Sequence, residues 1–244
     1  MAKRESTIKL IQNNTNKIIS IKIEQDEPYI SSGGYSMFQL KPDTKSVYIR
    51  DLEGNNVIDW GDNLKDTIGN AKQDIIGHTY NSTSNVPRSV TINGGFSRDA
   101  QSQPLVSPDV LIAVGHLGFV CGSLAGLFKD CVNLTTFMGI FDPELLNDYH
   151  GGESVKDCFS GCVALKRTFP TIFDTCRELT NFRDCFNGCS AWTGESPYTT
   201  VNGKKIKLWE RSRENGFAKP TIYDGCFRGC TNLSDYNSIP DSWK

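Results

Sequence analysis

Along the first hundred residues, short apolar runs alternate with residues that favour turns. The expected strands are Thr7–Gln12, Lys17–Glu24, Tyr35–Leu40, Ser46–Asp51, Val57–Trp60 and Ser89–Ile92. Several short strands at this spacing, with no helical periodicity between them, are typical of a β-sandwich. We therefore predict a mainly β fold in which residues 1–100 form a β-sandwich domain.

After residue 100 the apolar positions follow a repeat. The motif Phe-x-x-Cys-x-x-(Leu/Trp) occurs five times, and three copies contain Cys-Phe-x-Gly-Cys. The motif residues are Phe128, Cys131, Leu134, Phe159, Cys162, Leu165, Phe173, Cys176, Leu179, Phe186, Cys189, Trp192, Phe227, Cys230 and Leu233. Apolar residues at every third position suit a tight helical turn, and the glycine before the second Cys allows that turn to end. Because one such unit cannot bury its apolar side alone, residues 101–244 are predicted to form a short, irregular solenoid with these residues as its core.

The repeat is interrupted by an insertion between Ser190 and Tyr223. The motif phenylalanines are 31, 14, 13 and 41 residues apart, so the last interval carries extra residues. Asn202-Gly203 between two β-prone runs predicts a hairpin near residues 194–220. The candidate binding residues in this basic and aromatic segment are Tyr198, Lys204, Lys205, Lys207, Trp209 and Arg211. Insertions in repeat proteins often bind partners, although a solvated loop that caps the stack is the other interpretation.

The repeat region resembles the BspA-type leucine-rich repeats of gut bacteria and their phages. The resemblance lies in LFKDCVNLTTF (127–137), DCFSGCVALKRTFP (157–170), IFDTCRELTNFRDCFNGC (172–189) and GCFRGCTNLSDYNSIPDSW (225–243). It implies a curved solenoid of strands and turns that serves in adhesion or recognition, with no catalytic residues to carry over. The repeats here are few and unevenly spaced, unlike a long regular array.

A second resemblance covers residues 40–95. VIDWGDN (57–63), followed by His78-Thr79-Tyr80 and Val90-Thr91-Ile92, is similar to the PKD-type, immunoglobulin-like β-sandwich. This resemblance implies that Trp60 packs in the sandwich core and that Tyr80 ties its strand to a neighbouring backbone. Such domains act as spacers or adhesive modules.

Composition and charge narrow the function classes. The net charge is −2 and the hydrophobic fraction is 38%, which suits a folded protein without the clustered basic residues that nucleic acid requires. Val110 to Phe128 has no charged residue over 19 positions, but its glycines and the start of the repeat favour a buried segment over a membrane span. The charged start of the chain predicts no secretory signal.

The nine cysteines raise three chemical alternatives. Their apolar register favours reduced, buried thiols, while zinc binding or disulfides between adjacent turns remain alternatives. A catalytic cysteine would need one of the three histidines, His78, His116 or His150, as its base. Asp59 and Asp62 could contact calcium, or could accept hydrogen bonds within their own turn. We predict a protein with no cofactor and no enzymatic activity.

These observations lead to one expected function and two alternatives. The first is a non-catalytic bacteriophage virion protein, part of a tail, fibre or capsid surface, that recognises another virion protein or a host protein or glycan. It would be made in the host cytoplasm and released by lysis, and a homo-oligomer is compatible with such a role. The alternatives are a bacterial cell-surface adhesin and a carbohydrate-active protein.

Overall fold

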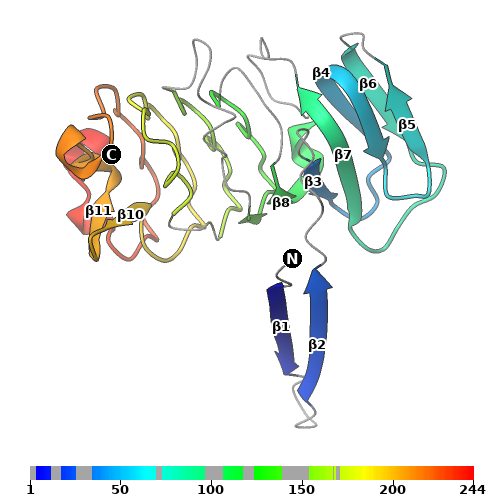
Figure 1. Ribbon diagram of the computed structural model, residues 1–244, viewed down its shortest axis with the longest axis horizontal. Coiled ribbons are helices and arrows are strands. Elements are labelled where there is room, and N and C mark those ends of the chain that lie inside the picture. Colours follow the sequence, from blue (N-terminus) through cyan, green and yellow to red (C-terminus); the bar gives the residue numbers. More distant parts are fainter. Residues whose placement is uncertain are drawn as a thin grey trace. The chain divides into compact units, whose positions relative to one another are not determined.

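The computed structural model describes residues 4–11, 18–25, 35–69, 73–96, 107–117, 124–138, 154–166, 168 and 171–244. The chain divides into two compact units, 1–32 and 33–244, a division that the sequence did not predict (Figure 1). The described residues form strands, tight turns and short 3-10 helices, which confirms the predicted mainly β fold. No helix in the described ranges is long and apolar enough to cross a membrane.

The first unit contains a two-stranded antiparallel hairpin. Strand β1 (Arg4–Ile11) pairs with β2 (Ile18–Gln25) over its whole length. Arg4 lies opposite Gln25 at one end, and Ile11 lies opposite Ile18 at the other.

The second unit begins with a seven-stranded sheet. Six of its strands lie in the order β5-β4-β7-β3-β8-β9, and the seventh, β6, pairs with β4. Its strands are β3 (Tyr35–Leu40), β4 (Ser46–Asp59), β5 (Lys65–Ile68), β6 (Gln73–Thr79), β7 (Arg88–Phe96), β8 (Leu111–His116) and β9 (Thr136–Phe137). Strand β8 pairs with β3 and with β9, so residues after position 100 belong to the same sheet as residues before it. The short helix η1 (Pro108–Val110) leads into β8.

Strand β4 joins two strands that the sequence predicts separately, Ser46–Asp51 and Val57–Trp60. Its first part pairs with β6 and its last part with β5, while β7 lies along its other edge. Asp51 and Gly54 have φ values of 58° and 79°, in the left-handed region, which allows the strand to change direction between its two parts. Asn56 is fully buried there. The segment 53–56, which looks like a turn in the sequence, therefore lies within a strand.

Alternating residues of the sheet form one apolar layer. The buried members are Phe38, Leu40, Val47, Ile49, Ile58, Trp60, Val90, Ile92, Leu111 and Val114. Successive side chains of a strand point to opposite faces, so every second residue reaches the same core. This layer is continuous with the buried side chains of the repeat region.

The repeat region is a stack of four tight turns, residues 126–131, 157–162, 184–189 and 225–230, which we call the stacked turns. Within each turn the Cys three residues after the motif Phe donates its N–H to the carbonyl of that Phe, as Cys162 does to Phe159 at 3.1 Å. Between turns, the N–H of Phe128 donates to Cys158 O (2.8 Å) and that of Phe159 to Cys185 O (2.7 Å). In Figure 1 these turns lie side by side, coloured from green through yellow to orange.

The position before this Cys has a left-handed backbone in all four turns. Asp130, Gly161, Gly188 and Gly229 have φ values of 58°, 77°, 78° and 76°. A Cβ on Gly161 would lie 2.3 Å from the carboxylate Oδ1 of Asp130 in the preceding turn. Both the backbone conformation and the closeness of the preceding turn therefore favour glycine at Gly161, whereas the first turn carries Asp130 in the same left-handed conformation.

The motif phenylalanines form a column inside the stacked turns. The ring centroids of Phe128 and Phe159 are 5.4 Å apart, those of Phe159 and Phe186 are 5.4 Å apart, and those of Phe186 and Phe227 are 5.7 Å apart, all in stacked geometry. Phe173 lies beside this column, 6.0 Å from Phe186 and tilted. The intervals from Phe159 to Phe173 and from Phe173 to Phe186 therefore make up one 27-residue coil, and Phe173 lies on another part of that coil, beside the column.

Candidate functional site

The insertion between the third and fourth stacked turns forms a hairpin. Strand β10 (Tyr198–Val201) pairs with β11 (Lys204–Lys207), and Asn202 and Gly203 form the two-residue turn between them. Their φ values of 50° and 78° are those that a two-residue hairpin needs. The helices η3 (Leu208–Glu210) and η4 (Arg213–Asn215) follow and return the chain to the stack.

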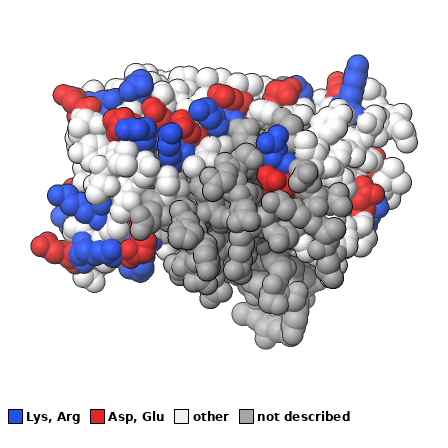
Figure 2. All heavy atoms as spheres, turned by 90° about the horizontal axis from the view of Figure 1, so that it is seen from above, with Lys and Arg blue, Asp and Glu red and all other residues white. Residues whose placement is uncertain are grey.

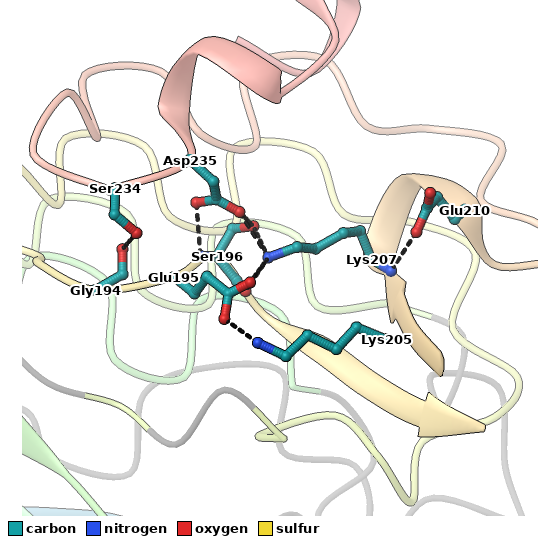
Figure 3. Close-up of polar contacts among 8 residues, drawn as sticks. All are labelled: Gly194, Glu195, Ser196, Lys205, Lys207, Glu210, Ser234 and Asp235. Carbon is teal, nitrogen blue, oxygen red and sulfur yellow. Dashed lines mark hydrogen bonds and ion pairs between the residues drawn. The ribbon is translucent and has the colours of Figure 1, made fainter. Parts of the chain in front are cut away.

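Lys207 lies in the centre of a polar network at the base of this hairpin (Figure 3). Its Nζ donates to Asp235 Oδ2 at 2.6 Å, to Ser196 Oγ at 3.1 Å and to Glu195 Oε1 at 3.3 Å. Ser196 is fully buried and donates its hydroxyl to Asp235 Oδ2 at 2.6 Å. A nucleophilic serine needs a free base beside it and access for a substrate. The ammonium of Lys207 forms ion pairs with two carboxylates, and Ser196 is fully buried, so this serine–lysine pair has neither.

The pKa values of both carboxylates are lowered. Burial raises the pKa of Asp235, but the hydrogen bonds from Lys207 and Ser196 outweigh it and bring the pKa below its usual range. At Glu195 the hydrogen bond from Lys205 has the largest effect and lowers the pKa. Both carboxylates are therefore ionised at neutral pH, and the network joins the hairpin to the loop that follows the last stacked turn.

We expect acid to weaken this network. A carboxylate with a lowered folded-state pKa stabilises the fold above its ordinary pKa, and this stabilisation is lost as the pH falls through the folded-state value. Asp235→Asn should therefore destabilise the protein by about 1–2 kcal/mol at pH 7, and by less below pH ~4, in urea unfolding measured at several pH values.

The control is Asp241→Asn, because that carboxylate is fully exposed and its ion pair with Lys244 is screened by solvent, so the loss of stability should be smaller. If Asp235→Asn lowered the free energy of unfolding equally at pH 7 and below pH ~4, ionised Asp235 would not be what stabilises this network.

The candidate binding residues of the insertion differ in exposure. Lys204 is exposed at the tip, whereas Lys205 pairs with Glu195 at 2.5 Å and lies over the Tyr198 ring, 4.3 Å from its centroid. Tyr198 and Trp209 are half-buried, and Trp209 packs edge-on against the buried aromatic column. Lys205 and Lys207 are therefore neutralised by neighbouring carboxylates, whereas Lys204 lies exposed.

Arg211 lies inside the protein, at 2% exposure. Its guanidinium donates to Phe173 O at 2.7 Å and to Cys176 O at 3.0 Å, and it lies over the Phe217 ring at 4.4 Å. Burial lowers the pKa of Arg211 to about 10, so it stays charged at neutral pH. Arg211 thus attaches the insertion to the coil that contains Phe173 and is not available to a ligand.

Replacing Arg211 by methionine should cost about 2 kcal/mol of unfolding free energy, because it removes charged donors from two buried carbonyls. The matched control is Arg213→Met, which removes an exposed ion pair with Glu178 and should cost less, because solvent screens that pair. Chemical denaturation of both variants measures the difference. Equal losses of unfolding free energy in the two variants would show that the buried contacts of Arg211 do not stabilise the fold.

The cysteines form hydrogen bonds between adjacent turns. Cys162 Sγ donates to Phe128 O (3.0 Å), Cys189 to Phe159 O (3.2 Å) and Cys230 to Phe186 O (3.0 Å). Burial raises the pKa of Cys230 to about 12, and also raises that of Cys185 well above its usual range. These two thiols are therefore protonated at neutral pH, which disfavours their use as nucleophiles or metal ligands. The eight cysteines among the described residues are buried and form no disulfide bond, and Cys121 lies outside the described residues.

We expect thiol titration under denaturing, non-reducing conditions to find most of the nine cysteines free. The same reagent should react slowly with the native protein, because the described thiols are buried. Finding only one free thiol after denaturation would mean that the cysteines are paired, and would contradict the hydrogen-bonded thiols described above.

The two predicted sandwich residues contact each other in the sheet. Trp60 is fully buried, and the Tyr80 hydroxyl donates to Trp60 O at 2.9 Å. Burial raises the pKa of Tyr80 to about 12, so the hydroxyl keeps its proton. His78 stacks on the Trp60 ring at 4.9 Å and its Nε2 lies 2.8 Å from Asp62 Oδ2.

The carboxylates of this turn accept hydrogen bonds from backbone amides. Asp59 Oδ1 accepts from Gly61 N at 3.0 Å, and Asp62 Oδ1 accepts from Leu64 N at 3.2 Å. Within the described ranges, no three His, Cys, Asp or Glu side chains are grouped as they would be around a metal ion. His150 lies outside the described residues, as does the side chain of His116.

Sequence reasoning missed the carboxylates that neutralise the insertion, Glu195 and Asp235. Nothing in their local sequence marks them, and Asp235 is 28 positions from Lys207. Comparison of the chain with protein-family models, with curated proteins and with solved structures gives no match.

Proposed function

We propose that this chain is a non-catalytic recognition protein whose repeat region is a leucine-rich-repeat solenoid of the BspA type and whose sheet is a PKD-like β-sandwich. Within this class, we propose a component of a bacteriophage virion that contacts another virion protein, or a protein or glycan of a bacterial host. A bacterial surface adhesin with the same architecture is the second candidate.

The observation that carries this proposal is the use of the motif residues. The phenylalanines stack on one another at 5.4–5.7 Å, and the thiols of Cys162, Cys189 and Cys230 each donate to the turn before their own. The cysteines, which in other settings could act as nucleophiles or metal ligands, thus hold neighbouring turns together here. In repeat proteins this arrangement supports an outer surface that is free to vary and to bind.

The described surface fits recognition of an uncharged or mixed-charge partner. Figure 2 shows positive and negative side chains interspersed over the described part of one face. Ion pairs connect adjacent stacked turns, Lys129 with Asp157 and Arg228 with Asp184, and Arg183 pairs with Asp224 just before the last two turns. Such a surface offers no strong attraction to a polyanion.

Two measurements test the proposal. We expect mass spectrometry of purified particles from the phage that encodes this chain to find it as a stoichiometric component. We also expect the purified chain to bind either dissociated particle proteins or the host cell surface. Absence from the particle would overturn the virion role, and the adhesin would then be tested on host cells.

The non-catalytic part of the proposal has its own test. Incubation of the purified chain with host polysaccharides should release no reducing ends above the level of a boiled control. Measurable release would favour the carbohydrate-active alternative.

A further inference from the structure

The last stacked turn, residues 225–230, leaves backbone donors unused. In the third turn and the residues before it, four N–H groups donate to carbonyls of the next turn: those of Phe182, Asp184, Phe186 and Gly188. The equivalent donors of the last turn belong to Tyr223, Gly225, Phe227 and Gly229. Among them, within the described part of the chain, the N–H of Phe227 alone finds a partner, Trp243 O at 2.8 Å. A row of hydrogen-bond donors with one occupied position therefore ends the stack.

Aromatic rings lie next to these donors. Tyr223 stacks on Trp243 with centroids 4.8 Å apart and planes at 4°, and Trp209 contacts the same indole edge-on at 6.3 Å. Trp243 is buried, whereas Tyr223 and Trp209 are half-buried and therefore partly exposed. Their contacts with Trp243 hold both rings in place before any ligand arrives.

The charges around these rings are paired. The pairs are Arg183 with Asp224 at 3.0 Å, Lys244 with Asp241 at 2.8 Å, and Lys207 with Asp235 at 2.6 Å. A charged ligand would have to compete with these existing partners. The local electrostatics therefore favour a neutral ligand.

We propose that this end of the stack, the Tyr223 platform (Trp209, Tyr223 and the free N–H groups of Tyr223 and Gly229), binds a neutral oligosaccharide. The apolar face of a sugar ring packs on the exposed part of the aromatic rings, and its hydroxyl oxygens accept hydrogen bonds from the free N–H groups. This inference rests on the proposed recognition function and assigns it a ligand class and a site.

An extended polypeptide strand fits the same edge less well. Pairing of a strand uses consecutive positions along the edge, and the Trp243 carbonyl already occupies the position of Phe227. The remaining donors that are not buried belong to Tyr223 on one side and Gly229 on the other, because Gly225 is buried. A compact ligand with several hydroxyl acceptors can use such separated donors.

The test uses the full chain on a printed array of neutral, sialylated and sulfated glycans. We expect signals on neutral glycans that do not change with NaCl concentration, since no charge pairing is involved. Tyr223→Ala should weaken binding roughly tenfold, the equivalent of about 1.4 kcal/mol. Tyr48→Ala is the matched control, because Tyr48 is an exposed tyrosine of the sheet.

A second measurement covers the case in which Tyr223→Ala fails to fold. In the unaltered chain, the bound glycan should slow hydrogen exchange at the Tyr223 and Gly229 amides, with little change at those of Asp184 and Gly188, which are already bonded. Binding to charged glycans only, or unchanged exchange at Tyr223 and Gly229 with glycan bound, would overturn the site.

The outcomes also separate this inference from the proposed function. If no neutral glycan binds but the chain still binds a virion or host protein, the glycan site is wrong and the recognition function stands. If neither glycan nor protein binds, both are wrong.

Discussion

Replacing Phe186 by alanine is expected to cost about 3–5 kcal/mol of unfolding free energy, the range for a buried aromatic residue. Phe186 has no exposed surface and lies in the aromatic column between Phe159 and Phe227, with Trp192 4.7 Å away. Its removal therefore opens a cavity between two turns and interrupts the column. Urea or thermal unfolding of the purified variant measures the effect.

The control for Phe186 is Tyr48→Ala, which removes a ring that is 41% exposed. It should cost far less, since exposed positions seldom contribute more than about 0.5 kcal/mol. A Phe186→Ala loss below about 1 kcal/mol would mean that the column does not stabilise the stacked turns.

Trp243→Ala is expected to release the last stacked turn. Trp243 covers the end of the aromatic column, accepts the Phe227 N–H and stacks with Tyr223. We expect the free energy of unfolding to fall by about 3–5 kcal/mol. Residues 225–243 should be destabilised most, because the terminal unit of a repeat stack depends on a cap. Hydrogen exchange should accelerate at the amides of Cys226 and Cys230 and change less at that of Phe159.

Trp243→Phe keeps an aromatic ring over the column and should lose clearly less stability than the alanine variant. Equal exchange rates in the last turn of Trp243→Ala and the unaltered chain would show that Trp243 does not hold this turn.

Short-range features followed from the sequence. Asn202-Gly203 predicted a two-residue turn, which lies between β10 and β11. The glycine before the second Cys predicted the end of a tight turn, and Gly161 has the left-handed φ that such an end requires. Both depend on the conformational range of one or two residues, so the local sequence carries the information.

Longer-range features did not follow. The sequence of 53–56 predicts a turn, yet strands β5, β6 and β7 pair along β4 and keep this segment within the strand. Strand β8 was not predicted, because its uncharged sequence also suits other buried segments. Pairing with distant strands decides such cases, and it overrides local preference.

The insertion shows the same limit at the level of a site. Its basic composition predicted a charged binding surface, but Lys207 pairs with Glu195 and Asp235, and Arg211 donates to buried carbonyls. Composition counts the charges of a segment and says nothing about which distant groups will pair with them.

By itself, the amino-acid sequence determined the mainly β character of this protein and the conformation of its tight turns, because both follow from residue type and short-range spacing. Only the tertiary structure decided which turns are neighbours, which cations are neutralised and where the stack leaves donors and aromatic rings at its surface. Those properties depend on contacts between residues that are tens of positions apart, and such contacts are specified by the whole packed chain.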